Sequence, residues 1–278
     1  MNGERKTDTI PGISKQSQPM TPYYEKEGIV LYCGDCLELL PSLARHSVTA
    51  IITDPPFVLQ PQHCQARTSR MVRNWADTSI LSTFWKVVVG HGVAALQPTG
   101  HFVTFCDAQS YAVFYPVLYN HFDHAVALVW DKVRTGMGVV WRRQHEFIIA
   151  ARWKNSIVFD EDKYRSDMLR YPRVPHYERD HPVDKPAALL ASLIVPLCPV
   201  GGTILDPFAG GGSTLLAAIA SGRQAIGIEM DERYCEIIAK RLDRQPLPPK
   251  SIRAQHRGAT ASTHGENQPF ITKEPLLS

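Results

Sequence analysis

Short apolar runs alternate with stretches of helical spacing through the middle of the chain. Val48–Thr53 is largely apolar, which indicates a strand buried on both faces. Within 79–96, Ile80, Phe84, Val87 and Val88 fall on one stripe at helical spacing, which predicts a helix with one buried side. Such alternation predicts an α/β fold, a mostly parallel, doubly wound sheet with helices on both faces. The same patterns predict further strands at 29–32, 102–105, 125–130, 147–152, 203–205 and 225–228, and further helices at 36–43, 108–119, 185–197, 213–221 and 232–242.

The two ends of the chain differ from the part between them. Residues 1–22 are polar and have no hydrophobic period, and the chain from Gln245 onward begins with several prolines and is then rich in polar residues. These compositions predict flexible tails at 1–22 and 245–278. The chain has 278 residues, of which 44% are hydrophobic and 21% are charged, and this fits one large domain at 23–244.

Composition argues against several classes of protein. No apolar run approaches the roughly 20 residues of a membrane span, and the polar N-terminus does not read as a secretory signal. The six cysteines are too scattered for a disulfide scaffold, so a reducing, cytoplasmic setting is expected. Cys33 and Cys36 form a C-x-x-C without a second pair, so no metal site is predicted. The formal net charge of +3 permits nucleic-acid binding without arguing for it.

A glycine-rich loop joins a predicted strand to a predicted helix at 204–214, where the chain reads Ile-Leu-Asp-Pro-Phe-Ala-Gly-Gly-Gly-Ser-Thr. Ligands of such sheets bind beyond the carboxyl ends of the strands, so this loop is a candidate site. The glycines allow close backbone approach, Ser213 or Thr214 can cap the helix, and free N–H groups at its start favour an anion. Glu229, at the end of the next strand, can accept hydrogen bonds from ribose hydroxyls. The alternatives are a structural turn or a loop for another nucleotide; the lysine of a phosphate-binding loop is missing.

A second candidate site follows the strand at 48–53, where the chain reads Asp54-Pro55-Pro56-Phe57. Prolines fix φ and lack an N–H, so the carbonyl groups here are held without competing donors. Asp54 and the Pro55 carbonyl can accept both hydrogens of a planar amino group, and Phe57 can stack on the ring that carries it. Two acceptors favour a nitrogen with an available lone pair, which can attack a sulfonium methyl in line. The alternative is a proline-rich turn with an incidental acid.

Together the two loops resemble those of the amino-methyltransferases of DNA. The sequence at 54–57 matches their (D/N/S)PP(Y/F) catalytic motif, and 206–212 resembles their DPFxGxG cofactor loop, with Gly211 where Ser or Thr is frequent. The catalytic motif comes first, an order that resembles the permuted β group. The resemblance covers about 28–242 and implies a Rossmann-like methyltransferase fold with S-adenosylmethionine as the methyl donor. Three more segments resemble the GD, R-x-x-H-E and HPxxKP segments of the family, at 31–36, 142–147 and 181–186.

The resemblance also implies roles for individual residues. Asp35 would lie by the cofactor adenine, Glu229 by its ribose and Lys185 near its methionine carboxylate. The catalytic residues would be Asp54, Pro55, Pro56 and Phe57. The cofactor contacts would be Asp35, Cys36, Lys185, Asp206, Phe208, Ala209, Gly210, Gly212, Ser213 and Glu229.

A target amino group inside a duplex must be rotated out of the helix, at a cost of a few kcal/mol, so DNA contacts are needed elsewhere. The segment after Phe57 carries three arginines before its first acid and lies beside the catalytic loop. The segment at 153–180 mixes basic, aromatic and acidic residues, and it occupies the place of the target-recognition region in the β group. An ordinary solvated loop is the alternative for both segments. The predicted DNA contacts are Arg67, Arg70, Arg73, Arg165, Arg170 and Arg173.

The first residue of the catalytic motif bears on the target base. The resemblance favours N6 of adenine, because N4-cytosine enzymes more often have Ser where this chain has Asp54. The predicted function is a site-specific adenine-N6 DNA methyltransferase, with an N4-cytosine enzyme or an inactive DNA-binding module as alternatives. Methylation of protein glutamine or of RNA fits less well, because glutamine enzymes usually have Asn there and the cofactor loop first. Double-stranded DNA is the expected partner, and a homodimer and a cognate restriction nuclease are further hypotheses.

Overall fold

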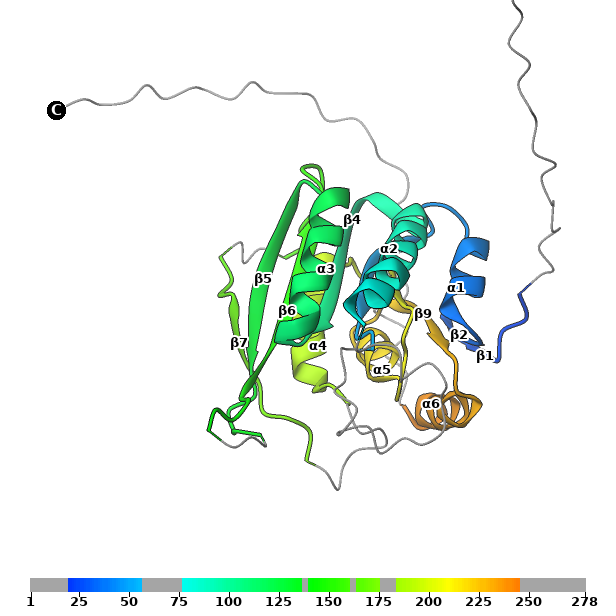
Figure 1. Cartoon of the computed structure of the whole chain (residues 1–278). Coiled ribbons are helices and arrows are strands. Elements are labelled where there is room, and N and C mark those ends of the chain that lie inside the picture. The colour runs from blue at the N-terminus through cyan, green and yellow to red at the C-terminus, as the bar shows by residue number, and fades with distance from the viewer. Residues whose placement is uncertain (1–19, 57–76, 137–139, 161–163, 176–183, 246–278) are drawn as a thin grey trace, which may run out of the picture.

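The structure of the protein is a computed structural model, and it describes residues 20–56, 77–136, 140–160, 164–175 and 184–245 (Figure 1). In this part of the chain, nine strands form one sheet in the order β1-β2-β9-β8-β3-β4-β6-β5-β7. The strands are β1 (Tyr24–Lys26), β2 (Ile29–Cys33), β3 (Val48–Thr53), β4 (Leu96–Cys106), β5 (His124–Asp131), β6 (His145–Arg152), β7 (Met168–Arg170), β8 (Thr203–Asp206) and β9 (Gln224–Glu229).

The centre of the sheet is parallel. β2, β9, β8, β3 and β4 run in one direction, so their carboxyl ends share one edge of the sheet. β6 runs antiparallel between β4 and β5, and β1 runs antiparallel to β2. The predicted mostly parallel α/β sheet is therefore confirmed, with β6 reversed inside it.

Helices cover both faces of the sheet, and each face has its own apolar core (Figure 1). β3 serves both cores, since Ile51 packs into one and Ile52 into the other, as expected for a strand buried on both faces. On one face lie α1 (Cys36–Leu39), the 3-10 helix η1 (Leu40–Ser42), α2 (Thr78–Ala95) and α3 (Ala108–His121). On the other face lie α4 (Ala187–Leu197), α5 (Ser213–Ala220) and α6 (Glu232–Arg244).

The buried side of α2 differs from the predicted stripe. Ile80 and Val87 are 44% and 40% exposed, so assigning them to the buried side was wrong. Phe84 and Val88 of the predicted stripe are buried, and Leu81 and Trp85 are fully buried beside them. Apolar residues occur on two sides of this helix, and packing against α3 selects the side that carries the large Trp85 ring. That ring stacks on Phe114 of α3, with ring centroids 4.4 Å apart.

Two short strands were not predicted from the sequence. β1 and β7 have three residues each, and such short segments carry no readable alternation of polar and apolar positions. β7 pairs in parallel with β5 and falls inside the predicted recognition segment at 153–180. The predicted tails at 1–22 and 245–278 lie almost wholly outside the described residues. Within the described ranges, no helix is both long enough and apolar enough to cross a membrane.

Candidate active site

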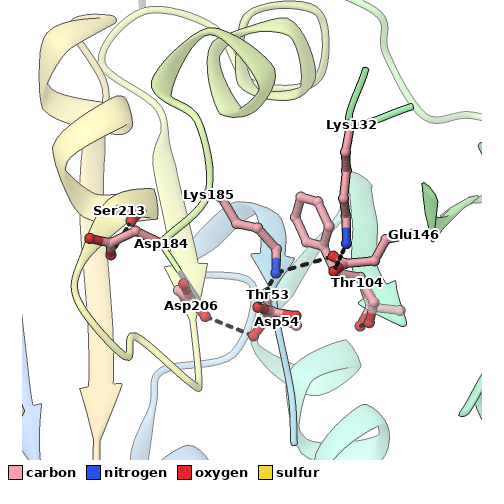
Figure 2. Close-up of polar contacts among 10 residues, drawn as sticks. Thr53, Asp54, Thr104, Lys132, Glu146, Asp184, Lys185, Asp206 and Ser213 are labelled. Atoms are coloured by element: carbon pink, nitrogen blue, oxygen red, sulfur yellow. Dashed lines mark hydrogen bonds and ion pairs between the residues drawn. The ribbon is translucent and has the colours of Figure 1, made fainter. Parts of the chain in front are cut away.

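The two loops singled out in the sequence meet at the carboxyl edge of the sheet. Asp54 directly follows β3, and Asp206 ends the neighbouring strand β8. The Thr53 hydroxyl donates a hydrogen bond of 2.7 Å to Oδ1 of Asp206, which ties the two strand ends together (Figure 2). Glu229 ends β9, the next strand along. The predicted meeting of the two loops at one sheet edge is therefore confirmed.

Asp54 presents its two oxygens to different surroundings. Oδ2 pairs with the ammonium group of Lys185 (Figure 2). Oδ1 is buried and has no hydrogen-bond partner among the described residues. Burial raises the pKa of Asp54 to about 6, and the nearby Glu146 carboxylate adds to the rise against the opposing charge of Lys185. Pro55 is also buried, so this strand end has a free carboxylate oxygen in a site largely shielded from water.

Lys185 lies between two acids and two aromatic rings. Its side chain is 7% exposed, and Nζ pairs with Asp54 and lies 3.4 Å from Oε2 of Glu146. Nζ is also 4.9 Å from the centroid of the Phe105 ring and 5.8 Å from that of Trp130. Burial opposes its charge, but the two carboxylates outweigh burial and raise the pKa of Lys185. The ammonium therefore stays charged and is directed to Asp54.

Glu146 and Lys132 extend this pairing, and neither was assigned a role from the sequence. Glu146 lies near the start of β6, and Lys132 directly follows β5. Oε1 of Glu146 pairs with the Lys132 ammonium, which in turn lies 5.1 Å from the centroid of the Trp130 ring (Figure 2). The R-x-x-H-E resemblance marked the segment that contains Glu146, but no pattern in the sequence pointed to Lys132.

The glycine loop is held to the end of β9 through Glu229. Gly210 and Gly212 have φ angles of 54° and 81°, a left-handed conformation that favours glycine. The Gly210 N–H donates to Oε2 of Glu229 at 2.8 Å, and the Asp231 N–H donates to Oε1 at 2.9 Å. Burial raises the pKa of Glu229, although these N–H groups oppose the rise. Glu229 thus fixes the loop and keeps further acceptor capacity.

The start of α5 differs from the prediction that Ser213 or Thr214 caps it. The N-cap is Gly212, which has no side chain to offer, because its left-handed φ turns the chain directly into the helix. The Ser213 hydroxyl instead donates to Asp184 at 2.9 Å, and Asp184 also pairs with Arg241 at 3.2 Å. The N-cap residue therefore offers no side chain to the N–H groups in the first turn of α5. Such N–H groups favour an anionic ligand.

A comparison with protein families gives this geometry its context. The model of the N6/N4 methyltransferases, described as DNA methylases, matches residues 48–240, from the start of β3 into α6. This chain belongs to the N6/N4 DNA methylase family. S-adenosylmethionine is the methyl donor of the family, so the predicted cofactor is confirmed.

Individual relatives match this methylase over different shares of its length. The type II methyltransferase M.ScaI of Streptomyces caespitosus is 26% identical over 260 residues, which cover 80% of this chain and 84% of that protein. The DNA adenine methyltransferase YhdJ of Escherichia coli K12 is 40% identical over 89 residues, which cover 31% and 30%. The solved structure of the PvuII DNA methyltransferase, described as cytosine-N4-specific, has a TM-score of 0.62 and 21% identity, covering 85% and 94%. The last likeness shows that the fold is shared.

Other residues expected to contact the cofactor lie around the same sheet edge of the methylase. Asp35 follows β2 and accepts a hydrogen bond of 2.8 Å from the Leu37 N–H, so it caps α1. The Cys36 side chain is buried in the core, which leaves its backbone for any ligand contact. Phe208 is half-buried after β8, and the Ala209 N–H donates to the carbonyl of β9 at Ile228.

The expected DNA contacts are described only in part. Arg165 pairs with Asp160, and Arg170 lies 3.6 Å from Asp131 with a side chain that is 73% exposed. Arg173 is half-buried and lies near enough to Lys132 to lower its pKa, after the larger effect of burial. Arg165 precedes β7, Arg170 is its last residue and Arg173 follows it. The remaining ones lie outside the described residues, together with the expected stacking ring: Arg67, Arg70, Arg73 and Phe57.

Proposed function

We propose that this methylase transfers a methyl group from S-adenosylmethionine to N6 of adenine in double-stranded DNA, with Asp54 and the Pro55 carbonyl as acceptors for the amino group. One observation carries the proposal. Oδ1 of Asp54 is buried without a hydrogen-bond partner among the described residues, while Oδ2 is held by Lys185. A buried, unpaired oxygen is costly unless a ligand supplies a donor, and the amino group of a flipped base is such a donor.

The proposed reaction needs few groups from the protein. When bound, S-adenosylmethionine supplies a methyl group on a positively charged sulfur. In the proposed reaction, N6 would form a bond to that methyl carbon as the sulfur–carbon bond breaks, which would leave a neutral thioether. The nitrogen gains the positive charge and then loses one proton, for which the Asp54 carboxylate is a suitable base because burial raises its pKa to about 6. Asp54 thus orients the amino group first and accepts a proton afterwards.

The glycine loop and its neighbours would hold the methyl donor. Glu229 has lone pairs left for ribose hydroxyls, because each oxygen accepts one backbone N–H. The uncapped start of α5 beyond Gly212 would receive the methionine carboxylate. Asp35 would contact the adenine from the end of β2. Lys185 was expected near the methionine carboxylate, and its pairing with Asp54 supports a role at the amino group instead.

Support for adenine rather than cytosine comes from two sources. The catalytic motif begins with Asp54, as the resemblance expects for adenine enzymes. The segment shared with YhdJ, named as a DNA adenine methyltransferase, has a high identity of 40% over 89 residues. Methylation of N4 of cytosine is the alternative outcome of the experiment, since the PvuII enzyme, described as cytosine-N4-specific, has the same fold.

The experiment is methyl transfer from labelled S-adenosylmethionine to a long unmethylated duplex of mixed sequence, followed by analysis of the nucleosides. We expect label in N6-methyldeoxyadenosine. Label in N4-methyldeoxycytidine would overturn the adenine assignment, and a folded, cofactor-binding protein that labels no DNA would overturn the function.

A pair of matched variants tests the role of Asp54. Asp54→Ala should lower the rate by about 100-fold or more, as loss of a group that stabilises developing charge does, with cofactor affinity kept. Asp107→Ala is the control, because Asp107 also follows a strand at this edge but caps α3 through the Ser110 N–H. It should cost about 1 kcal/mol of stability and retain the rate. An Asp54→Ala protein with full activity would contradict the mechanism.

A further inference from the structure

Four buried or half-buried charged side chains alternate in sign beside the proposed amino-group site. Asp54 pairs with Lys185, Lys185 contacts Glu146, and Glu146 pairs with Lys132 (Figure 2). The side-chain exposures are 18%, 7%, 19% and 9% along this series. Two acids and two bases balance in formal charge, and we call these four residues the charge chain.

The four members come from separate parts of the fold. Asp54 follows β3, Lys185 precedes α4, Glu146 lies in β6 and Lys132 follows β5. Burying ions is costly unless each has partners of opposite charge in good geometry. A lone Asp54–Lys185 pair would satisfy charge neutrality, so the added Glu146–Lys132 pair calls for another explanation.

The positions of the groups around Lys185 supply an explanation for the second pair. The Lys185 ammonium contacts both acids, since Nζ pairs with Oδ2 of Asp54 and lies 3.4 Å from Oε2 of Glu146 (Figure 2). This second carboxylate, together with the ring of Phe105 at 4.9 Å, limits where the ammonium can lie. Lys132 in turn holds the other oxygen of Glu146. The result is one fixed contact on Oδ2 of Asp54 and a free Oδ1.

We propose that Glu146 and Lys132 are positioning residues for methyl transfer, which hold Lys185 on Oδ2 of Asp54 so that Oδ1 faces the amino group of the target base. This inference rests on the proposed function of Asp54. It assigns to these two residues a role that is exerted through Lys185.

Other titratable groups also lie near the charge chain. Asp206 on β8 and the Cys106 thiol on β4 lie near Asp54, and Arg173 lies near Lys132. None of these is changed in the variants below, so their influence is constant. The readout is the acid limb of the pH–rate profile, meaning the pH range in which the methyl-transfer rate falls as the solution becomes more acidic. Its midpoint reports the pKa of Asp54.

The variants are Glu146→Gln, Lys132→Met and the double variant, measured in the full-length protein by single-turnover methyl transfer from pH 5 to 9. Glu146→Gln should lower the rate by about 10- to 100-fold, the scale expected for a misplaced group. It should also move the acid limb to lower pH, because the Glu146 charge raises the pKa of Asp54. Lys132→Met should move the limb to higher pH, because Glu146 then loses its neutralising partner.

The double variant separates positioning from stability. Removing both charges restores the balance, so its melting temperature should recover toward that of the wild type. Its rate should stay low, because a neutral amide oxygen then replaces the Glu146 carboxylate beside Lys185 and holds the ammonium less firmly. The matched control is Glu236→Gln, which removes an acid from an exposed pair with Lys240 at 2.6 Å and should leave rate and acid limb unchanged.

Glu146→Asp provides a second test if the Glu146→Gln protein does not fold. Glu146→Asp keeps the charge but withdraws the carboxylate by one methylene, so the rate should fall while the acid limb stays near that of the wild type. The inference is overturned if the Glu146 variants keep the wild-type rate, if the double variant regains it, or if both single variants shift the acid limb in the same direction. If instead Asp54→Ala is fully active or the wild type labels no DNA, the proposed function itself has failed.

Discussion

At the scale of single residues, the central feature is an acid in surroundings that oppose its charge. Asp54 loses hydration through burial, which favours its protonated form, while Lys185 favours the ionised form. Burial wins, and the pKa rises to about 6. Such a value suits a group that must be ionised to orient an amino group and must then accept a proton near neutral pH.

The raised pKa predicts an acid limb in the activity of the wild-type protein. The rate of methyl transfer should fall as the pH drops through about 6, because only the carboxylate form of Asp54 accepts two hydrogen bonds from donors. At pH 5 the rate should be about a tenth of that at pH 8, from the ionised fraction of a group with this pKa. Single-turnover measurements at several pH values check this.

Loss of fold would mimic that result, so circular dichroism at pH 5 is the control. Protonation of Asp54 does not itself destabilise the fold, because an acid whose pKa is raised in the folded state binds its proton more tightly there than in the unfolded chain. Its contribution to stability is present at low pH and is lost as the pH rises through about 6. A rate that holds to pH 4.5 in the folded protein would contradict the assignment.

At the scale of elements, the site depends on loops that follow parallel strands. β3, β8 and β9 end side by side, and each has a carboxylate at its end: Asp54 directly after β3, Asp206 as the last residue of β8 and Glu229 as the last residue of β9. The turn into α5 is the most constrained of these loops. Gly212 has a φ of 81°, and a Cβ there would lie 3.0 Å from the side chain of Ile238 on α6.

Gly212→Ala is therefore expected to destabilise the protein. A left-handed backbone costs an L-residue about 1–2 kcal/mol, and Ile238 must also shift to admit the methyl group. Urea unfolding should show this loss, and the dissociation constant for S-adenosylmethionine should rise because the start of α5 moves.

A second glycine provides the control. Gly90 lies within α2, and a Cβ added there would meet nothing within 4 Å. Gly90→Ala should raise stability by about 0.5–1 kcal/mol, since alanine loses less backbone entropy in a helix. Equal effects of the two substitutions would show that the Gly212 conformation is not what the loop requires.

At the scale of the whole molecule, the β7 end of the sheet has an arginine side chain exposed to solvent. Arg170 on β7 is largely exposed, and its ion pair with Asp131 at 3.6 Å is loose. β7 is the strand at one end of the sheet order, while α6 packs near β2 and β9 toward the other end. Duplex DNA that enters the carboxyl edge beside Asp54 would lie against the β7 side, close to Lys132 and Arg173.

Arg170→Ala should weaken binding to duplex DNA, with a slope of log affinity against log salt that is reduced by about 0.9, the value for one phosphate contact. Fluorescence anisotropy with a labelled duplex at several salt concentrations measures this slope. Arg244→Ala is the matched control, because Arg244 is an exposed arginine at the end of α6. Identical slopes for the two variants would remove Arg170 from the DNA-binding surface.

The sequence by itself determined the alternation of strands and helices, the two strand-end loops and the family. These are local properties, since apolar periodicity and short motifs need only neighbouring residues. Only the tertiary structure decided which charges meet. Lys185 is 131 residues from Asp54 in the chain, and it reaches both Asp54 and Glu146 because β6 is reversed beside β4 and brings its first residues to the same edge. No local pattern encodes the direction of a strand in the sheet or the side of α2 that packs inward, because both are set by the neighbours that folding supplies.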